Sequence, residues 1–307
     1  MARFGTILLT GVNGQVGYEL QHTLSVLGRT VALDRSQLDL VDATAIRRVV
    51  REIKPNLIIN PAAYTAVDKA ESEPELAFAI NATAPAVLAE EAAKLGAMFV
   101  HYSTDYVYDG SKPSPYVETD ATNPLSVYGK SKLTGEAAIR AVGLPHLILR
   151  TSWVYGVRGK NFLRTILRLA AEREQLRVVS DQVGAPTWIR TIGEATASAL
   201  LNWHEGKSGT YHLTNAGETS WHGFAQAIIE RYEKNRSECG WPALKVAAAG
   251  VEAISSSEYP TPAPRPANSR LDCMKFAKAF SEKIPGWQDA LSECMAELDL
   301  TMEGSNK

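Results

Sequence analysis

The first half of the chain alternates short apolar runs with longer stretches of helical periodicity. The apolar runs are TILLT (6–10), TVALD (30–34), LIIN (57–60), MFVHYS (98–103) and HLILR (146–150). Amphipathic patterns such as DATAIRRVVREI (42–53) lie between them. Continuous apolar strands separated by helices are typical of a parallel sheet covered on both faces. The pattern predicts an α/β fold, a Rossmann-type doubly wound parallel sheet joined by right-handed crossovers.

The second half of the chain is less regular. NFLRTILRLAAERE (161–174) and FAQAIIERYEK (224–234) predict helices, and RVVS (177–180) predicts a strand. The stretch YPTPAPRPANSR (259–270) holds four prolines and is incompatible with a regular helix or a central strand. We interpret it as an ordered loop, with a flexible linker as the alternative.

A glycine-rich turn follows the first apolar run. Gly11, Gly14 and Gly17 have the spacing G-x-x-G-x-x-G, and Gln15 and Val16 lie between the last two. Glycine permits a tight turn and a close backbone approach to a pyrophosphate, and the N-terminus of the next helix offers free N–H groups. A simple tight turn is the alternative. The position between a strand and a helix at the start of the chain favours a dinucleotide site.

The ends of the next two strands supply further candidates for this site. Asp34 ends the second run, where a carboxylate can bind the adenosine ribose hydroxyls. The adjacent Arg35 can pair with a 2′-phosphate instead, and a solvated charge pair is the alternative. Asp39 is expected near the adenine, and the third run ends in small residues, 60–63, that let a nucleotide lie against the backbone. Both NADH and NADPH are therefore open as cofactor.

Candidate catalytic residues follow the fourth run. That run ends in Ser103, Thr104 and Asp105, and Tyr128 and Lys132 lie further along, four residues apart on a predicted helix. A solvent-facing pair is the alternative, but a hydroxyl-bearing strand end in a dinucleotide fold favours catalysis. We expect the ammonium and an oxidised nicotinamide to lower the phenol pKa from its usual value near 10. Thr104, Tyr128 and Lys132 together can then polarise a carbonyl and protonate its oxygen as hydride arrives.

Composition narrows the classes of protein. The 307 residues include 32 Lys and Arg against 34 Asp and Glu, so the net charge of −2 argues against nucleic acid as a partner. No stretch approaches the ~20 apolar residues that span a membrane, and the N-terminus lacks a signal-peptide pattern. Three distant cysteines and six scattered histidines fit neither a disulfide framework nor a metal motif. We expect a soluble cytoplasmic protein.

These motifs resemble the dTDP-4-dehydrorhamnose reductase family of the extended short-chain dehydrogenase/reductase superfamily. The similarity covers nearly the whole chain. It includes TGVNGQVGYEL (10–20), PAAYTAVDKAESEPELAFAINA (61–82), HYSTDYVYDG (101–110), ETDATNPLSVYGKSKLTGE (118–136), RTSWVYG (150–156), DQVGAPT (181–187) and YPTPAPRPANSRL (259–271). The resemblance implies NAD(P)H-dependent reduction of the C4 keto group of dTDP-4-dehydro-β-L-rhamnose to dTDP-β-L-rhamnose, for cell-surface polysaccharide.

The resemblance also implies a role for each site residue. Catalysis would fall to Thr104, Asp105, Tyr128 and Lys132. The cofactor would contact Gly11, Gly14, Gln15, Val16, Gly17, Asp34, Arg35, Asp39, Leu40, Ala62, Ala63, Tyr64, Thr65, Tyr102, Ser103, Tyr128 and Lys132. The nucleotide-sugar substrate would contact Thr104, Asp105, Trp153, Asn161 and Arg265. A core position for Trp153 and a solvated side chain for Arg265 are the alternatives.

The resemblance further implies a division of the chain and a question about metal. Residues 1–157 would form the NAD(P)-binding domain, and 158–307 mainly a smaller α/β substrate-binding domain with segments that return to the first. Some family members form a Mg²⁺-linked dimer through clustered acids. Here Glu19 is present, but Arg190 follows the GAPT segment where an acid would be wanted. We therefore expect no metal site, and a monomer or weak homodimer.

Three other functions stay open. Related 4,6-dehydratases have an acid pair after the threonine, whereas this chain has Thr104-Asp105-Tyr106, with one acid of the two. An epimerase would return the hydride that a reductase consumes. A non-catalytic regulatory subunit of methionine adenosyltransferase also resembles the family, but the retained Tyr128 and Lys132 argue against a pure binding role.

Overall fold

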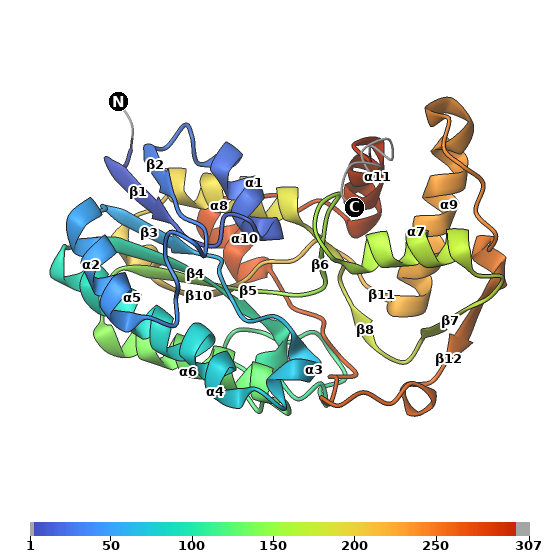
Figure 1. The fold of residues 1–307 in the computed structure, drawn as a ribbon, viewed down its shortest axis with the longest axis horizontal. Coiled ribbons are helices and arrows are strands. Elements are labelled where there is room, and N and C mark those ends of the chain that lie inside the picture. Colours follow the sequence, from blue (N-terminus) through green and yellow to red (C-terminus); the bar gives the residue numbers. More distant parts are fainter. Residues whose placement is uncertain (1–2, 299–307) are drawn as a thin grey trace.

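The fold is built on a six-stranded parallel sheet (Figure 1). The computed structural model describes residues 3–298. The strand order is β10-β5-β4-β3-β1-β2. The strands are β1 (Thr6–Leu9), β2 (Arg29–Ala32), β3 (Leu57–Asn60), β4 (Met98–Thr104), β5 (His146–Thr151) and β10 (Gly209–His212). The predicted fold class and the five predicted strands are confirmed, and the sixth strand comes from the later chain.

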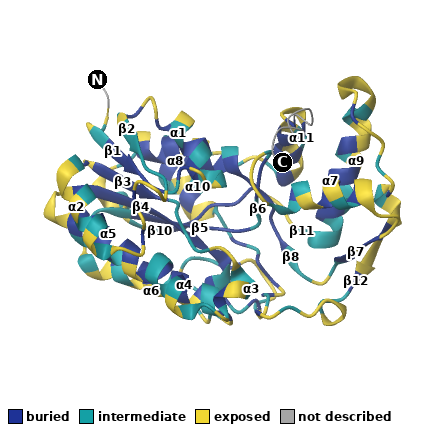
Figure 2. Ribbon diagram, in the orientation of Figure 1, coloured by how far each residue is buried: buried dark blue, intermediate teal, exposed yellow. Residues whose placement is uncertain are grey.

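Helices cover both faces of this sheet, as Figure 1 shows. Along β1, Ile7 and Leu9 pack with one layer of helices, and Leu8 between them packs with the other. The first layer holds α1 (Gln15–Thr23), α8 (Ile189–Leu201) and α10 (Met274–Phe280). The second holds α2 (Ala43–Ile53), α5 (Ala84–Lys94) and α6 (Val127–Val142). The inner strands β1, β3, β4 and β5 are almost wholly buried and the outer sides of the helices are exposed (Figure 2), which explains the continuous apolar runs of these strands. The edge strand β2 has no buried residue.

The chain between β3 and β4 does not form one continuous helix. The chain forms α3 (Val67–Ala70) and α4 (Pro74–Phe78), passes through one π-helical turn (Ala79–Thr83), and continues as α5. Within that turn, the Asn81 side chain accepts from the backbone N–H of Tyr64 at 2.8 Å and donates to Ser131 of α6 at 3.0 Å. The turn thereby ties the loop after β3 to the helix that carries Tyr128 and Lys132.

The later chain forms a second layer of structure beside the carboxyl ends of the strands (Figure 1). Its helices are α7 (Phe162–Glu172), α9 (Trp221–Cys239) and α11 (Trp287–Ala296). Its strand pairs are β7 (Leu176–Val179) with β12 (Val251–Ile254), β6 (Val154–Tyr155) with β9 (Thr187–Trp188), and β8 (Val183–Gly184) with β11 (Thr219–Ser220). Residues 259–270 form no helix or strand, as predicted.

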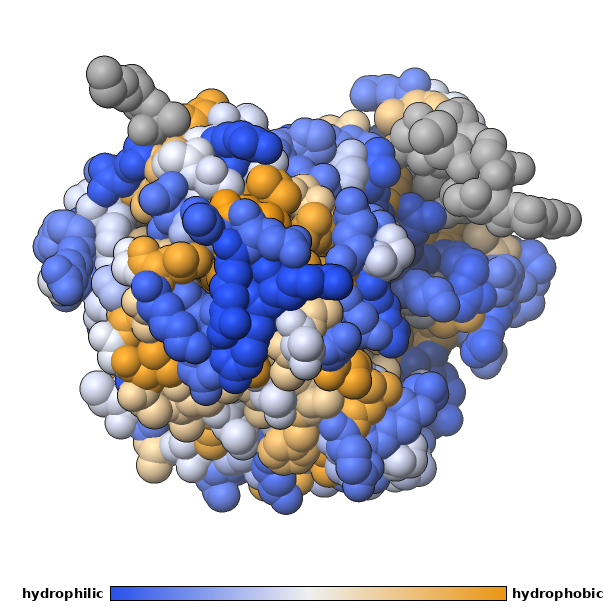
Figure 3. All heavy atoms as spheres, turned by 60° about the vertical axis from the view of Figure 1, so that its left-hand side comes forward, coloured by the Kyte–Doolittle hydropathy of each residue, from blue (hydrophilic) through white to orange (hydrophobic). Residues whose placement is uncertain are grey.

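The outer surface carries few large apolar side chains. On the face drawn in Figure 3, hydrophobic residues form small separate areas between hydrophilic ones. No helix within residues 3–298 has the length and apolar character that crossing a bilayer requires.

Candidate active site

One cleft of about 730 Å³ opens at the carboxyl ends of the strands. It brings together most of the residues predicted for the cofactor and for catalysis, from segments as distant as the first turn and the end of β5. The predicted residues that line it are Gly11, Gly14, Gln15, Val16, Gly17, Asp34, Arg35, Asp39, Leu40, Ala62, Ala63, Thr65, Tyr102, Ser103, Thr104, Asp105, Tyr128, Lys132 and Trp153. This is the position at which ligands bind in open α/β sheets.

The glycine-rich turn requires glycine for steric reasons. Gly11 has a φ of 60°, and a Cβ atom there would lie 2.8 Å from Cα of Ala62. A Cβ on Gly17 would lie 2.2 Å from the carbonyl oxygen of Gly11. Gly14 caps α1 without any side-chain hydrogen bond to the first turn. The N-terminus of α1 therefore presents backbone N–H groups at the cleft, which suits a phosphate.

Asp34 and Arg35 differ in how firmly they are held. The carboxylate of Asp34 accepts from the hydroxyl of Ser36 at 2.6 Å and from Nδ2 of Asn13 at 3.3 Å. These bonds, the one from Ser36 foremost, lower the pKa of Asp34 despite some burial. The side chain of Arg35 is 77% exposed and lies 3.9 Å from Asp39. The cleft therefore has a carboxylate held by hydrogen bonds beside an exposed guanidinium.

The helix α6 is placed so that Tyr128 faces the end of β4. The hydroxyl of Ser126 caps the helix by accepting from the N–H of Gly129 at 3.1 Å. A Cβ on Gly129 would lie 2.2 Å from the carbonyl oxygen of Tyr106. This close approach sets the Tyr106 ring edge-on against Tyr128, with 5.5 Å between ring centroids.

The pKa of Tyr128 shifts in the direction opposite to the expectation. Burial raises it to about 12, and a hydrogen bond from Thr104 only partly opposes this. The ammonium of Lys132 instead donates to the carbonyl oxygen of Tyr102 at 2.6 Å. Burial also lowers the pKa of Lys132 to about 8. Tyr128 is consequently a protonated phenol at neutral pH, which suits a proton donor.

Asp105 is a buried carboxyl group at the floor of the cleft. Its Oδ1 accepts from the hydroxyl of Thr104 at 3.0 Å, whereas Oδ2 has no hydrogen-bond partner among the described residues. Burial raises its pKa to about 6, and the neighbouring hydroxyls of Ser269 and Thr104 partly oppose this rise. A buried polar atom without a partner favours a ligand that supplies one.

Three predicted site residues do not line the cleft. Tyr64 donates its hydroxyl to Glu73, and Asn161 caps α7. The amide of Asn161 also donates to Oε1 of Gln15 at 2.9 Å, so its contact with the cleft passes through that side chain. The guanidinium of Arg265 donates to Asp68 at 2.8 Å.

Trp153 lies at the cleft as predicted, in an unusual conformation. Its φ is 49°, a region that residues other than glycine rarely occupy. Its ring stacks on Trp221 with centroids 3.6 Å apart, and a Cβ on Gly184 would lie 2.7 Å from the indole. Neighbouring aromatic and glycine residues thus hold the indole against the cleft.

Sequence reasoning missed several residues of the site. Asn13, Tyr106, Ser152 and Lys160 line the cleft. Their neighbours in sequence were identified, and adjacency to a strand end was the available signal for Asn13 and Ser152. Lys160 had no such signal, because it reaches the cleft only through the loop before α7.

Glu19 is not the only acidic residue near Arg190 among those that the structure describes. The guanidinium lies 3.4 Å from Glu19 and also contacts Glu297. Burial raises the pKa of Glu194. The charge of Arg190 opposes this rise, and the charges of Glu19 and Glu293 add to it. Arg190 therefore lies among several acids, of which Glu19 and Glu297 contact its guanidinium.

Comparison with known sequences agrees with this geometry. The family model described as RmlD substrate binding domain matches residues 5–300. A dTDP-4-dehydrorhamnose reductase of Burkholderia thailandensis is 48% identical over 298 residues, which cover 95% of this chain and 98% of that protein.

Two solved structures share the fold over nearly the whole chain. A dTDP-4-dehydrorhamnose reductase of Clostridium acetobutylicum superposes with a TM-score of 0.87 at 36% identity and covers 95% of this chain and 99% of its own. The dTDP-4-dehydrorhamnose reductase of Bacillus anthracis, solved in complex with NADP, has a TM-score of 0.86 at 35% identity. The match covers 97% of this chain and 100% of that one. The chain therefore belongs to the dTDP-4-dehydrorhamnose reductase family of oxidoreductases.

Proposed function

We propose that this protein reduces the C4 keto group of dTDP-4-dehydro-β-L-rhamnose to dTDP-β-L-rhamnose with NADPH or NADH, in polysaccharide biosynthesis. The observation that carries the proposal is that Tyr128, Thr104 and Lys132 share one cleft with the glycine-rich turn. The similar proteins of Burkholderia thailandensis and Bacillus anthracis bear the name of this reductase.

The residues present fit a nicotinamide dinucleotide. The turn at 11–17 leaves its backbone open where a Cβ would intrude, and the uncapped N-terminus of α1 suits the pyrophosphate. Asp34 would hold the adenosine ribose, and Arg35 would meet a 2′-phosphate. When bound, the reduced cofactor supplies the hydride that the ketone accepts.

Tyr128 donates the proton to the C4 oxygen. Its raised pKa keeps the phenol protonated at neutral pH, and the hydroxyl of Thr104 would turn from Asp105 to donate a second hydrogen bond to the same oxygen. Loss of the proton leaves a phenolate, and the cation of Lys132 stabilises that negative charge in the buried site. These interactions strengthen as charge develops, so they favour the transition state over the bound ketone.

The substrate is held from the other side of the cleft. Trp153 borders the sugar, and the unpartnered Oδ2 of Asp105 accepts from a sugar hydroxyl. Arg265 binds the nucleotide diphosphate while it retains Asp68, since a guanidinium has five N–H donors. Asn161 acts through Gln15 at the cofactor side.

The deciding experiment is an assay of NADPH oxidation at 340 nm with dTDP-4-dehydro-β-L-rhamnose. A reductase consumes one cofactor for each sugar reduced, whereas an epimerase returns the hydride and a binding subunit consumes none. Loss of the signal in Tyr128→Phe, with cofactor binding retained, would tie the activity to this cleft. Sugar epimerised without cofactor consumption would refute the proposal.

The remaining features of the protein follow from this function. We propose that residues 1–157 bind the cofactor and that 158–307 mainly bind the substrate, with α8, β10 and α10 returning to the sheet. We also propose that the protein works in the cytoplasm, as a monomer or weak homodimer, on a nucleotide sugar. Nucleic acid and membrane have no part in this proposal.

A further inference from the structure

Lys132 is held by a second ionisable side chain that lies beneath the cleft. Nζ of Lys132 lies 3.2 Å from Nε2 of His101, in addition to its bond to the carbonyl oxygen of Tyr102. His101 is 0% exposed and Lys132 is 1% exposed. His101 belongs to β4 and is not among the residues that line the cleft. Its contact with the site therefore passes through Lys132.

The imidazole is fixed on its other side by two strand ends. The amide of Asn60 lies 3.3 Å from Nδ1 of His101, and the hydroxyl of Thr10 lies 2.6 Å from the same amide. Thr10 and Asn60 are buried as well, at 2% and 0% exposed. The series Thr10, Asn60 and His101 thus ends in a buried side chain, so it has no contact with bulk water from which protons could enter. We infer that it orients Lys132.

The protonation of these groups follows from their contacts. Burial and the charge of Lys132 hold the pKa of His101 well below its usual value, so the imidazole is neutral. An ammonium donates only, so Nε2 is the bare nitrogen and Nδ1 carries the hydrogen. Nδ1 lies toward Asn60, whose backbone carbonyl oxygen accepts a hydrogen bond from the imidazole.

Few charges act directly on this pair. Glu136 lies one helical turn beyond Lys132 and is bound by Arg150 of β5, and Asp105 and Tyr128 lie on the side of the cleft. The π-helical turn that packs on α6 has no ionisable side chain. Other elements on α6 carry Asp68, Lys69, Glu75, Glu90, Glu91, Lys94 and Tyr106, of which Asp68, Lys69, Glu90, Glu91 and Lys94 form ion pairs elsewhere.

We propose that His101 is a positioning residue for the reaction: its Nε2 accepts a hydrogen from Lys132, and this contact keeps Lys132 an ammonium aimed at the cleft. Burial by itself favours the uncharged amine, whereas a neutral acceptor favours the charged donor. Without His101, Lys132 would retain only the Tyr102 carbonyl among these partners. The kinetic consequence rests on the proposed function, but the ionisation of Lys132 does not.

The first measurement therefore needs no substrate. Protein labelled with ¹³C at lysine Cε is titrated by NMR, and Lys132→Arg identifies the signal of Lys132. We expect His101→Leu to increase the acid dissociation constant of Lys132 at least about tenfold, the change that one pKa unit represents. His101→Gln carries an amide oxygen that can accept the same hydrogen, so it should restore most of the difference. His146→Gln on β5 is the matched control, because that imidazole contacts the carbonyl oxygen of Leu144 and not Lys132.

The second measurement is the pH profile of kcat. The alkaline limb should move to lower pH in His101→Leu and stay in place in His101→Gln and His146→Gln. An unchanged ionisation of Lys132 in folded His101→Leu overturns the proposal, as does an equal change in the control. If His101→Leu does not fold, His101→Asn decides in the same way, because its shorter amide does not reach Nζ. A shifted ionisation in a protein that reduces no sugar would refute the proposed function and support this inference.

Discussion

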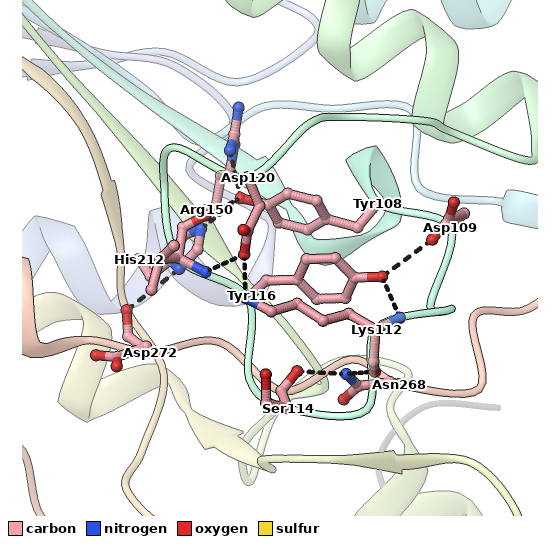
Figure 4. Close-up of polar contacts among 11 residues, drawn as sticks. Tyr108, Asp109, Lys112, Ser114, Tyr116, Asp120, Arg150, His212, Asn268 and Asp272 are labelled. Carbon is pink, nitrogen blue, oxygen red and sulfur yellow. Dashed lines mark hydrogen bonds and ion pairs between the residues drawn. The ribbon is translucent and has the colours of Figure 1, made fainter.

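The ion pair between Glu136 and Arg150 joins the catalytic helix to the centre of the sheet. Nε and Nη2 of Arg150 donate to the two carboxylate oxygens of Glu136 at 2.9 and 2.6 Å. The two side chains are 0% and 4% exposed. Nη1 of Arg150 donates to the hydroxyl of Tyr108 at 2.6 Å, and His212 lies 2.9 Å from the same hydroxyl (Figure 4). Removal of one charge would leave the other buried in this network.

We expect Glu136→Gln to lower the free energy of unfolding by about 3–5 kcal/mol, the usual result of breaking one side of a buried pair. The change keeps the shape of the side chain, so no cavity contributes. Arg140 also contacts Glu136, at 3.0 Å, but its side chain is 40% exposed. Solvent screens that contact, so Arg140→Gln should cost less than ~1 kcal/mol and is the matched control.

The dependence on pH has a definite sign. Burial alone would raise the pKa of Glu136, but the hydrogen bonds and charge of Arg150 outweigh it and hold the pKa below the usual 4.5. A lowered pKa in the folded state gives stability that is complete above the unfolded value and is lost as the pH falls through the folded value. The difference between wild type and Glu136→Gln should therefore be constant near neutral pH and shrink below about pH 4.5.

Urea unfolding followed by circular dichroism and tryptophan fluorescence measures these differences. The double variant Glu136→Leu/Arg150→Met replaces both charges with apolar groups and should be more stable than Glu136→Gln, because no charge is left unpaired. Equal losses in Glu136→Gln and Arg140→Gln would refute the reasoning. So would a difference that grows as the pH is lowered.

Three further predictions concern the proposed reaction. Tyr128→Phe should lower kcat by ~10²–10⁴ and leave cofactor affinity nearly unchanged, whereas Lys132→Met should lower both; single-turnover kinetics and cofactor titration separate them. Asp34 and Arg35 should act in opposite directions, each worth about 1–3 kcal/mol, so kcat/KM for NADPH and NADH should differ by less than ~10³; a larger ratio would contradict a balanced pair. Activity should persist in EDTA because Arg190 lies among the nearby acids; loss of activity with dissociation in light scattering, both restored by Mg²⁺, would show otherwise.

The sheet was largely predictable because its inner strands are buried on both faces. Runs such as LIIN are continuously apolar and therefore easy to recognise as strands in the sequence, and β3 has the predicted bounds. The sixth strand, β10, has the sequence GTYH, which is short and not distinctly apolar. It becomes a strand because β5 offers an unpaired edge, with Tyr211 opposite Leu149. Pairing with a distant segment determined this element, and a local pattern does not contain that information.

The site residues also fall into those that local sequence places and those that only distant contacts place. Residues that follow strand ends converge whenever the sheet is parallel, so Gly11, Asp34 and Thr104 could be placed from the sequence. The contact of Arg265 with Asp68 joins residues 197 positions apart, through a loop without regular structure. No periodicity indicates such a contact, and only the resemblance to a family suggested that Arg265 belongs to the site.

The pKa of Tyr128 shows why residue spacing alone did not determine the chemistry. Four residues on a helix bring Lys132 to the same face, and its ammonium together with an oxidised nicotinamide led us to expect a lowered pKa. The solvation of the phenol depends instead on the turn after β4, which buries it and raises its pKa to about 12. In the proposed reaction the phenol would give up its proton only as the C4 oxygen becomes more basic, and the phenolate would then need the nearby cation. That cation contacts the carbonyl oxygen of Tyr102 and the imidazole of His101, both on β4, so in our proposal the strand beneath the cleft would tune how well the helix above it catalyses.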